Sequence, residues 1–227
     1  MNIEASFVIS AARASDVPRD GLAEIALVGR SNVGKSSLIN ALVRQRVARA
    51  SAAPGKTRLA NVYRVVRDAV APFYFVDLPG YGYARGGRSA AQEFEALSAA
   101  YFGRDRQEGR EWQETGPARP APPAKVAALL LVDARHPRLA ADLEAWRWLT
   151  TTVARCAVVA TKIDKLSRAE RQRALKANEA AFEHPVLPVL ASTGEGLDEL
   201  WKLIERLTSR NPNNRRPPRP PLPHRKS

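Results

Sequence analysis

One glycine-rich run contains most of the residues whose types and spacing suit the binding of phosphate and a metal ion. It consists of Gly29, Arg30, Ser31, Asn32, Val33, Gly34, Lys35, Ser36 and Ser37. Its first eight residues fit the pattern G-x-x-x-x-G-K-[ST], whose backbone N–H groups surround phosphate oxygens. Gly29 and Gly34 let the chain turn so that successive N–H groups point at one centre. Lys35 would then reach the β- and γ-phosphates, and the Ser36 hydroxyl would bind a magnesium ion. We therefore predict a site for a nucleotide phosphate chain with Mg²⁺.

The segments on either side of this run have the periodicity that the pattern requires. Residues 25–28 form an apolar run of strand length. Apolar residues then recur at helical spacing, over a helix expected to end near Arg46: Leu38, Ile39 and Leu42. The positive end of that helix adds to the field at the phosphates. A chance match in a glycine turn is the alternative, and it would not require this strand–loop–helix context.

A second group of candidate residues follows the apolar run 73–76, and it reads Asp77, Leu78, Pro79 and Gly80. An aspartate at the carboxyl end of a strand beside a phosphate loop is the position of the Walker-B carboxylate, which binds the magnesium ion. Gly80 would offer its backbone N–H to the γ-phosphate, so the loop can respond to that phosphate. We expect Ser36 and Asp77 to be metal ligands.

A third motif, Thr161, Lys162, Ile163 and Asp164, predicts which base is bound. An ionised Asp164 accepts hydrogen bonds from guanine N1–H and the guanine 2-amino group, and adenine offers neither donor there. Two such bonds contribute roughly 3–6 kcal/mol, or about 10²–10⁴ in preference. Lys162 would cover the base with its aliphatic stem. A solvated helix start is the alternative, but after a strand of a phosphate-loop protein the motif favours guanine.

The remaining segments predict an α/β fold in which these loops meet. We expect strands at 7–9, 25–28, 59–66, 73–76, 126–132, 157–160 and 186–190. Helices are expected after the phosphate loop, over 89–103, over 140–152, after a capping box of Ser167 and Glu170, and over 197–207. This alternation indicates a doubly wound, mostly parallel sheet flanked by helices, with ligand loops at the carboxyl ends of the strands.

Composition bounds the domain organisation. The chain has 227 residues, of which 44% are hydrophobic, so one globular domain with a sizeable core is the simplest expectation. We expect an N-terminal edge segment over 1–22 and a nucleotide-binding domain over 23–208. This domain would contain a flexible insertion at 104–124, and a basic, proline-rich, disordered tail would cover 209–227. The longest apolar run, 126–132, is too short to span a membrane, and the N-terminus lacks a basic leader, so we expect a cytoplasmic protein.

Positive charge indicates the class of partner. The net charge is +13, and the tail 209–227 has six basic residues and no acidic one, which leaves +7 on residues 1–208. A polyanionic partner such as RNA fits this balance. A protein that is only soluble and arginine-rich is the alternative, and the tail is open to the same two interpretations.

These motifs together resemble the EngB family of ribosome-biogenesis GTPases, over most of residues 5–208. The resemblance rests on Asp20-Gly21-Leu22, on 29–37, on Pro54-Gly55-Lys56-Thr57, on the run D-L-P-G-Y-G-Y-A over 77–84, on 132–136 and on 161–164. The D-L-P-G-Y-G-Y-A run is the most discriminating, because general GTPase motifs do not require its tyrosines. The chain is thus expected to have a GTPase G domain that binds GTP and GDP.

The resemblance implies a monomeric nucleotide-dependent switch in assembly of the large ribosomal subunit, with a link to cell division. Its partners would be assembly intermediates of that subunit, through rRNA and ribosomal proteins, and not a membrane. Thr57, with Gly55 and Lys56 before it, would be the switch threonine that closes on magnesium when GTP is bound. Ala191 and Ser192 would form the guanine loop, with a shift of one residue left open.

Two residues bear on the rate of hydrolysis. Tyr81 follows the D-x-x-G motif directly, where many GTPases have the glutamine that orients the attacking water, so we expect slow turnover. Asn32 resembles the asparagine that holds a potassium ion in related GTPases, where the cation neutralises developing charge. A turn residue with a locally bonded side chain is the alternative for Asn32. The expected catalytic residues are Asn32, Lys35, Thr57 and Gly80.

Two rival functions are weighed against this expectation. An adenine-dependent phosphate-loop kinase or ATPase is disfavoured by Asp164. An RNA-binding module with a vestigial nucleotide site is disfavoured by the complete set of phosphate and metal residues: Lys35, Ser36, Thr57, Asp77 and Gly80.

The role of Asp164 gives a direct prediction. Asp164→Asn should weaken GDP binding and improve binding of xanthosine diphosphate, because xanthine has an oxygen where guanine has the 2-amino group. Competition binding with the two nucleotides measures this. An unchanged preference for guanine would show that Asp164 does not contact the base.

Overall fold

The computed structural model describes residues 2–48, 59–68, 70–81, 95–104 and 126–209, and the structural statements below concern these residues. Several predicted features lie outside them. These are the switch residues Gly55, Lys56 and Thr57, residues 105–124 of the predicted insertion, and the tail from residue 210 onward.

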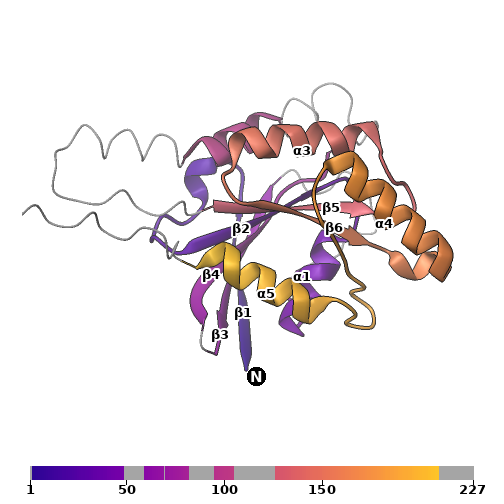
Figure 1. Cartoon of the computed structure of the whole chain (residues 1–227). Helices are drawn as coiled ribbons and strands as arrows, with labels where there is room; N and C mark the ends of the chain where they lie inside the picture. The colour runs from indigo at the N-terminus through magenta and orange to yellow at the C-terminus, as the bar shows by residue number, and fades with distance from the viewer. Residues whose placement is uncertain (1, 49–58, 69, 82–94, 105–125, 210–227) are drawn as a thin grey trace, which may run out of the picture.

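Seven strands form one sheet in the order β1-β3-β4-β2-β5-β6-β7 (Figure 1). Their bounds are β1 (Ile3–Ala11), β2 (Ala23–Gly29), β3 (Ala60–Arg67), β4 (Val70–Asp77), β5 (Val126–Asp133), β6 (Cys156–Thr161) and β7 (Val186–Pro188). β3 is antiparallel to both of its neighbours, and every other neighbouring pair is parallel. The sheet is therefore mostly parallel, as the alternation of strands and helices predicts, and β1 is the edge strand expected near residues 7–9.

Helices cover both faces of this sheet. They are α1 (Lys35–Val43), α3 (Ala140–Thr152), α4 (Arg168–Phe182) and α5 (Leu197–Thr208), with a further helix over 95–104 and short 3-10 turns η1 (Ala14–Asp16) and η3 (Ile163–Lys165). Helices α1 and α5 pack on one face, and α3, α4 and the helix over 95–104 pack on the other (Figure 1). This arrangement confirms the doubly wound fold. Within the described ranges, every helix is too short or too polar to cross a bilayer.

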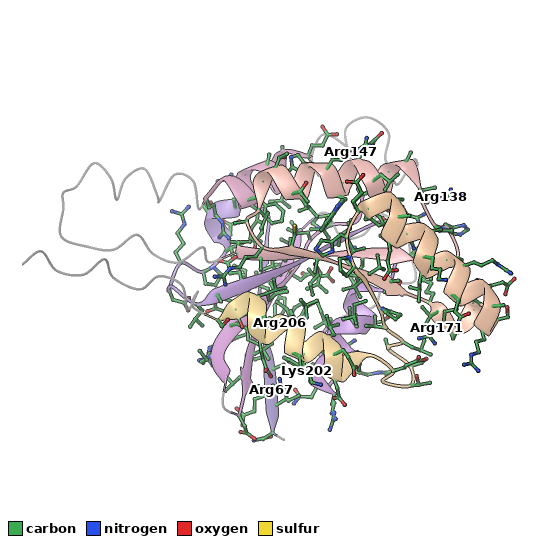
Figure 2. All side chains as sticks on the ribbon, viewed as in Figure 1. Arg67, Arg138, Arg147, Arg171, Lys202 and Arg206 are labelled. Atoms are coloured by element: carbon green, nitrogen blue, oxygen red, sulfur yellow. The ribbon has the colours of Figure 1, made fainter. Side chains whose placement is uncertain are left out.

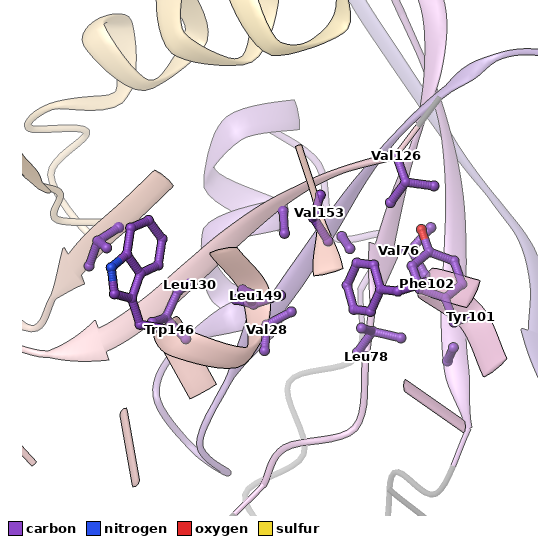
Figure 3. Close-up of a cluster of buried hydrophobic side chains, with 14 of the residues drawn as sticks. Val28, Val76, Leu78, Tyr101, Phe102, Val126, Leu130, Trp146, Leu149 and Val153 are labelled. Carbon is purple, nitrogen blue, oxygen red and sulfur yellow. The ribbon is translucent and has the colours of Figure 1, made fainter. Parts of the chain in front are cut away.

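Two buried layers explain the apolar pattern of β5. All eight residues of β5 are buried. Leu130 faces one layer, where it lies with Val28 of β2 and with Trp146 and Leu149 of α3 (Figure 3). Leu129 faces the other layer, beneath α1 and α5. A strand with helices on both sides has no solvent face, so its sequence is continuously apolar.

The helix ends predicted from the sequence can be compared with the structure at α4 and α1. The start of α4 is confirmed, and the end of α1 is wrong. The predicted capping box opens α4: Ser167 N–H donates to Glu170 Oε2 at 2.8 Å, and Glu170 N–H donates to Ser167 Oγ at 3.4 Å. The expected end of α1 near Arg46 is wrong. The helix ends at Val43, because Arg44 adopts a left-handed conformation with φ of 54° and caps it.

The predicted extent of the last strand is also too long. β7 ends at Pro188 and not at Leu190. Leu190 instead pairs with Glu195 across the following loop, so its backbone closes a turn and does not extend the sheet.

Arg104 corrects the predicted start of the insertion. It belongs to the helix over 95–104 and is only 6% exposed. Its Nη2 donates to Glu24 Oε2 at 2.6 Å, and its guanidinium carbon lies 4.4 Å from the centroid of the Tyr101 ring. A buried cation needs such partners, so Arg104 is part of the packed core and not of a surface insertion.

Candidate functional site

The predicted site residues meet along the edge of the sheet where the parallel strands end. β2 lies at the centre of the sheet, between β4 and β5. Its register pairs Leu27 with Asp77 of β4 and Gly29 with Leu131 of β5. The loops that follow β2, β4, β5 and β6 therefore leave the sheet side by side, as expected for a ligand site at a topological switch point.

The two glycines of the phosphate loop have different roles. Gly34 has a φ of +112°, so it supplies the predicted turn at the start of α1. Gly29 is needed for space, because a Cβ atom there would lie 2.8 Å from Leu131 O. Asn32 supplies a further left-handed position, with φ of 61°. Asn32 is thus a turn residue, as the alternative predicts, and its side chain is exposed without a hydrogen bond to the described residues.

Lys35 and Asp77 are both buried at the phosphate loop, and their opposite charges influence one another. Lys35 is 9% exposed, and its Nζ donates to Gly29 O at 3.4 Å. Burial lowers the pKa of Lys35, and the negative charge of Asp77 offsets part of that effect. Burial likewise raises the pKa of Asp77, while Lys35 and the hydrogen bond from Ser36 oppose the rise. A bound phosphate chain would surround Lys35 with negative charge and favour its ammonium form.

The oxygens of Ser36 and Asp77 fit the predicted magnesium ion. Ser36 Oγ donates to Asp77 Oδ2 at 2.7 Å, whereas Asp77 Oδ1 is buried and has no hydrogen-bond partner among the described residues. Such an orphaned carboxylate oxygen is costly unless it gains a ligand. The described residues contain no group of three or more His, Cys, Asp or Glu that could hold a metal alone. Among the described residues, Ser36 and Asp77 would hold the ion together with nucleotide oxygens.

Thr161 connects the guanine motif to the phosphate loop. It is 6% exposed, and its Oγ1 lies 2.7 Å from Val33 O and 3.1 Å from Val132 O. The hydroxyl has one proton to donate, and the shorter bond reaches the phosphate loop. A threonine therefore suffices at this position to join the two loops.

Lys162 is held in place by Asp133, a residue to which the motifs assign no role. Lys162 Nζ donates to Asp133 Oδ2 at 3.0 Å, and Arg135 donates through Nε and Nη2 at 2.9 and 2.7 Å. Burial raises the pKa of Asp133, but the hydrogen bonds from Arg135 and Lys162 outweigh it, so the pKa lies well below its ordinary value. The sequence does offer a sign of Asp133: like Asp77, it is an aspartate that directly follows an apolar run of strand length.

The remaining guanine-site residues lie on neighbouring loops. Asp164 is in η3, and its partly exposed carboxylate pairs with Lys165 Nζ at 3.1 Å. Ala191 and Ser192 lie in a closed loop after β7, where Leu190 N–H donates to Glu195 O at 2.9 Å. Val189 N–H donates to Ala160 O at 2.8 Å and holds this loop beside β6. The structure thus brings the guanine motif and the guanine loop together.

The D-x-x-G segment packs directly against the phosphate loop. A Cβ atom at Gly80 would lie 2.5 Å from Ser31 N, so only glycine fits there. Tyr81 N–H donates to Gly29 O at 3.3 Å, and Ser31 N–H donates to Tyr81 O at 3.2 Å. Leu78 is buried in the core, so its side chain is not available to a nucleotide.

The Tyr81 side chain reaches α3. Its Oη donates to Asp142 Oδ1 at 2.8 Å, and burial together with this carboxylate raises the pKa of the phenol. Arg30 Nε donates to the same Oδ1 at 3.2 Å. The residue at the position of the water-orienting glutamine is therefore engaged with a helix, and Asp142 is a second residue at this site that the motifs do not indicate.

Comparisons with known proteins agree with this geometry. A family model described as "50S ribosome-binding GTPase" matches residues 24–162. The chain is similar to "Probable GTP-binding protein EngB" of Solibacter usitatus, with 40% identity over 204 residues that cover 89% of this chain and 95% of that protein. A protein of the same name from Clostridioides difficile is 38% identical over 210 residues, which cover 90% and 93%.

A solved structure supports the fold. The crystal structure of "a probable GTP-binding protein engB" is similar with a TM-score of 0.60 at 20% identity, over 82% of this chain and 98% of that one.

Asp133 gives a prediction with a defined pH dependence. Asp133→Asn should lower the free energy of unfolding at pH 7 by about 1–3 kcal/mol, because hydrogen bonds to a charged group are lost. The pKa of Asp133 is depressed in the folded state, so its stabilisation is present above the ordinary value of 3.8 and is lost as the pH falls below it. Urea unfolding at pH 7 and at pH 3 measures the difference between the two proteins, which should shrink at pH 3. An equal difference at both pH values would contradict the ion pairs.

Proposed function

Because the chain belongs to the EngB family of GTP-binding proteins, and so is a GTPase, we propose that it acts as a nucleotide-dependent switch in assembly of the large ribosomal subunit. The observation that carries this proposal is the packing of Gly80 against Ser31, which sets the γ-phosphate loop on the phosphate loop itself. The matching family model, described as "50S ribosome-binding GTPase", supports the choice of partner. Membership of this family decides against the adenine-dependent and vestigial alternatives.

The phosphate chain is bound by the loop, by Lys35 and by the N-terminus of α1. Ser36, Asp77 and Thr57 are the proposed ligands of Mg²⁺. When bound, this ion neutralises negative charge that develops between the β- and γ-phosphates. Lys35 adds a positive charge in a buried position, where electrostatic interactions are stronger than in water.

The base is recognised by the loops after β6 and β7. Asp164 accepts hydrogen bonds from guanine, and Lys162 covers the base while Asp133 restrains its ammonium group. Thr161 joins this loop to Val33, so the base contacts and the phosphate contacts are mechanically connected. A nucleotide that contacts both the guanine motif and the phosphate loop is therefore bound by loops that are already joined to each other before it binds.

The switch depends on contacts that only GTP can make. Gly80 would meet the γ-phosphate, and Thr57 would close on magnesium when that phosphate is present. A ligand shifts a conformational equilibrium by its difference in affinity for the two states. GDP and GTP thus favour different arrangements of the loops, and these arrangements differ in affinity for the ribosomal particle.

Positive charge supports an RNA-containing partner. Arg138, Arg147, Lys202 and Arg206 are exposed and lie on several elements of the described surface (Figure 2). Some other basic residues there are paired, as Arg67 is with Glu205. The tail 209–227 adds six basic residues and no acidic one. We propose that this tail adds electrostatic attraction to rRNA.

Slow hydrolysis is part of the proposal. Tyr81 is engaged with Asp142 and has no amide to orient water. The exposed Asn32 side chain beside the phosphates is available to hold a potassium ion, which would neutralise developing charge. Ribosomal particles would then supply further acceleration.

Nucleotide-dependent binding of ribosomal particles tests the switch. The protein should co-sediment with large-subunit assembly particles from a lysate more strongly in a non-hydrolysable GTP analogue than in GDP, and the binding should weaken as salt rises. Lys35→Ala, which loses phosphate contacts in both states, is the control and should show no nucleotide effect. Equal binding of the protein to the particles in GDP and in the GTP analogue would contradict the proposal.

The potassium hypothesis has its own experiment. Phosphate release by the purified protein should be slow, faster in potassium chloride than in sodium chloride, and faster again with ribosomal particles. Asn32→Ala should remove the difference between the two salts. Rapid turnover of the unmodified protein in sodium chloride without a partner would show that Tyr81 does not limit the rate and that Asn32 is only a turn residue.

A further inference from the structure

Asp142 of α3 joins two loops of the nucleotide site through a single oxygen atom. Its Oδ1 accepts hydrogen bonds from Tyr81 Oη at 2.8 Å and from Arg30 Nε at 3.2 Å. Asp142 is 1% exposed, so its carboxylate depends on these donors and has little access to water. The three residues come from the phosphate loop, from the segment after Gly80 and from α3.

The backbone ties the same two loops together. Arg30 and Tyr81 form a parallel β-bridge beyond the ends of β2 and β4, shifted by one residue from the register of the two strands. Gly80 lies against Ser31 within this bridge. Tyr81 is the next residue in the chain. If Gly80 moves away from the phosphate loop, Tyr81 must shift as well, and this shift would strain or break its hydrogen bond to Asp142 of α3.

Removing either donor would leave Asp142 poorly satisfied. A buried carboxylate that loses a hydrogen-bond donor incurs much of the desolvation penalty of its charge. Arg30 Nη2 is buried without a hydrogen-bond partner among the described residues, so the guanidinium is held at its place by the Nε contact and by packing. The cluster therefore favours the arrangement in which Tyr81 stays on α3 and Gly80 stays at the phosphate loop.

We propose that Asp142 is a positioning residue that selectively stabilises the GTP-bound state by holding Tyr81, and through it Gly80, at the phosphate loop. GDP lacks the γ-phosphate that Gly80 meets, so its affinity does not depend on this contact. The inference deepens the proposed function, since it rests on Gly80 being the group that senses the γ-phosphate. It also makes α3 the helix that is mechanically connected to the nucleotide state.

The test is a double-mutant cycle read as a ratio of nucleotide affinities. Tyr81→Phe keeps the ring and removes the hydroxyl, and Asp142→Asn keeps the shape and removes the charge. Each should raise the Kd of a non-hydrolysable GTP analogue about tenfold, as expected for a lost hydrogen bond to a charged group, and leave the Kd of GDP within about twofold. The double variant should be no weaker than the worse single variant, because both changes remove the same interaction.

A matched control exists in the same sheet. Tyr74 Oη donates to Asp20 Oδ2 at 2.6 Å, a tyrosine–aspartate bond that does not involve the phosphate loop. Tyr74→Phe should leave both nucleotide affinities unchanged. Thermal unfolding of every variant shows that a change in affinity is not a general loss of folding.

Two results would overturn the role of Asp142. One is an equal loss of GDP and GTP-analogue affinity in Tyr81→Phe, which would indicate a merely structural bond. The other is an additive double variant, which would show that the two side chains act independently. Neither result depends on ribosomal particles, so the inference can fail while nucleotide-dependent particle binding stands, and the reverse is equally distinguishable.

Discussion

Parallel pairing of β2 with both β4 and β5 sets the position of the phosphate loop relative to Asp77 and to β5. Leu27 pairs with Asp77 on one side and Gly29 pairs with Leu131 on the other, so the three strands end at nearly the same level. The phosphate loop therefore begins beside the carboxylate that fits magnesium. Because no side chain would fit at Gly29 against Leu131 O, the loop can approach β5 closely enough to be supported by it.

Buried charged side chains are concentrated at the nucleotide site, where strands β2, β4 and β5 end. Three buried carboxylates lie along one edge of the sheet, and each interacts with basic side chains: Asp77 with the buried Lys35, Asp133 with Lys162 and the exposed Arg135, and Asp142 with Arg30. Taking such groups out of water is costly, and hydrogen bonds offset the cost only where the geometry is good. Four buried side-chain atoms lack a hydrogen-bond partner among the described residues; Asp77 Oδ1 and Arg30 Nη2 belong to the nucleotide site, and Ser98 Oγ and Asn178 Nδ2 lie outside it. Unsatisfied polar atoms there fit a site completed by its ligand.

Contacts in the rest of the domain support this edge of the sheet. Helices on both faces bury β5 completely, and the Arg104–Glu24 pair fixes the helix over 95–104 to β2. Thr161 links the guanine motif to Val33, and Asp133 restrains Lys162. Because these contacts hold the loops in place before a nucleotide binds, little of the free energy of base binding would be spent on ordering the loops. The segments that would respond to GTP are joined to this frame at Gly80 and Tyr81.

Short-range patterns in the sequence were enough to predict the phosphate loop, the carboxylate at the end of β4, the bounds of α3 and the capping box of α4. These features depend on backbone conformation and on the periodicity of a few consecutive residues, which any single sequence displays. The sequence also predicted a mostly parallel sheet, because strands and helices alternate along it.

Tertiary structure alone decided which distant residues share a hydrogen bond. Tyr81 and Arg30 lie 61 and 112 residues from Asp142, and the strand order brings them together. The same holds for Arg104, whose charge suggests a surface residue until Glu24 and Tyr101 are placed around it. Residue type constrains local conformation, but the environment of a charge is set by chain segments remote in sequence, so these contacts could not be read from spacing.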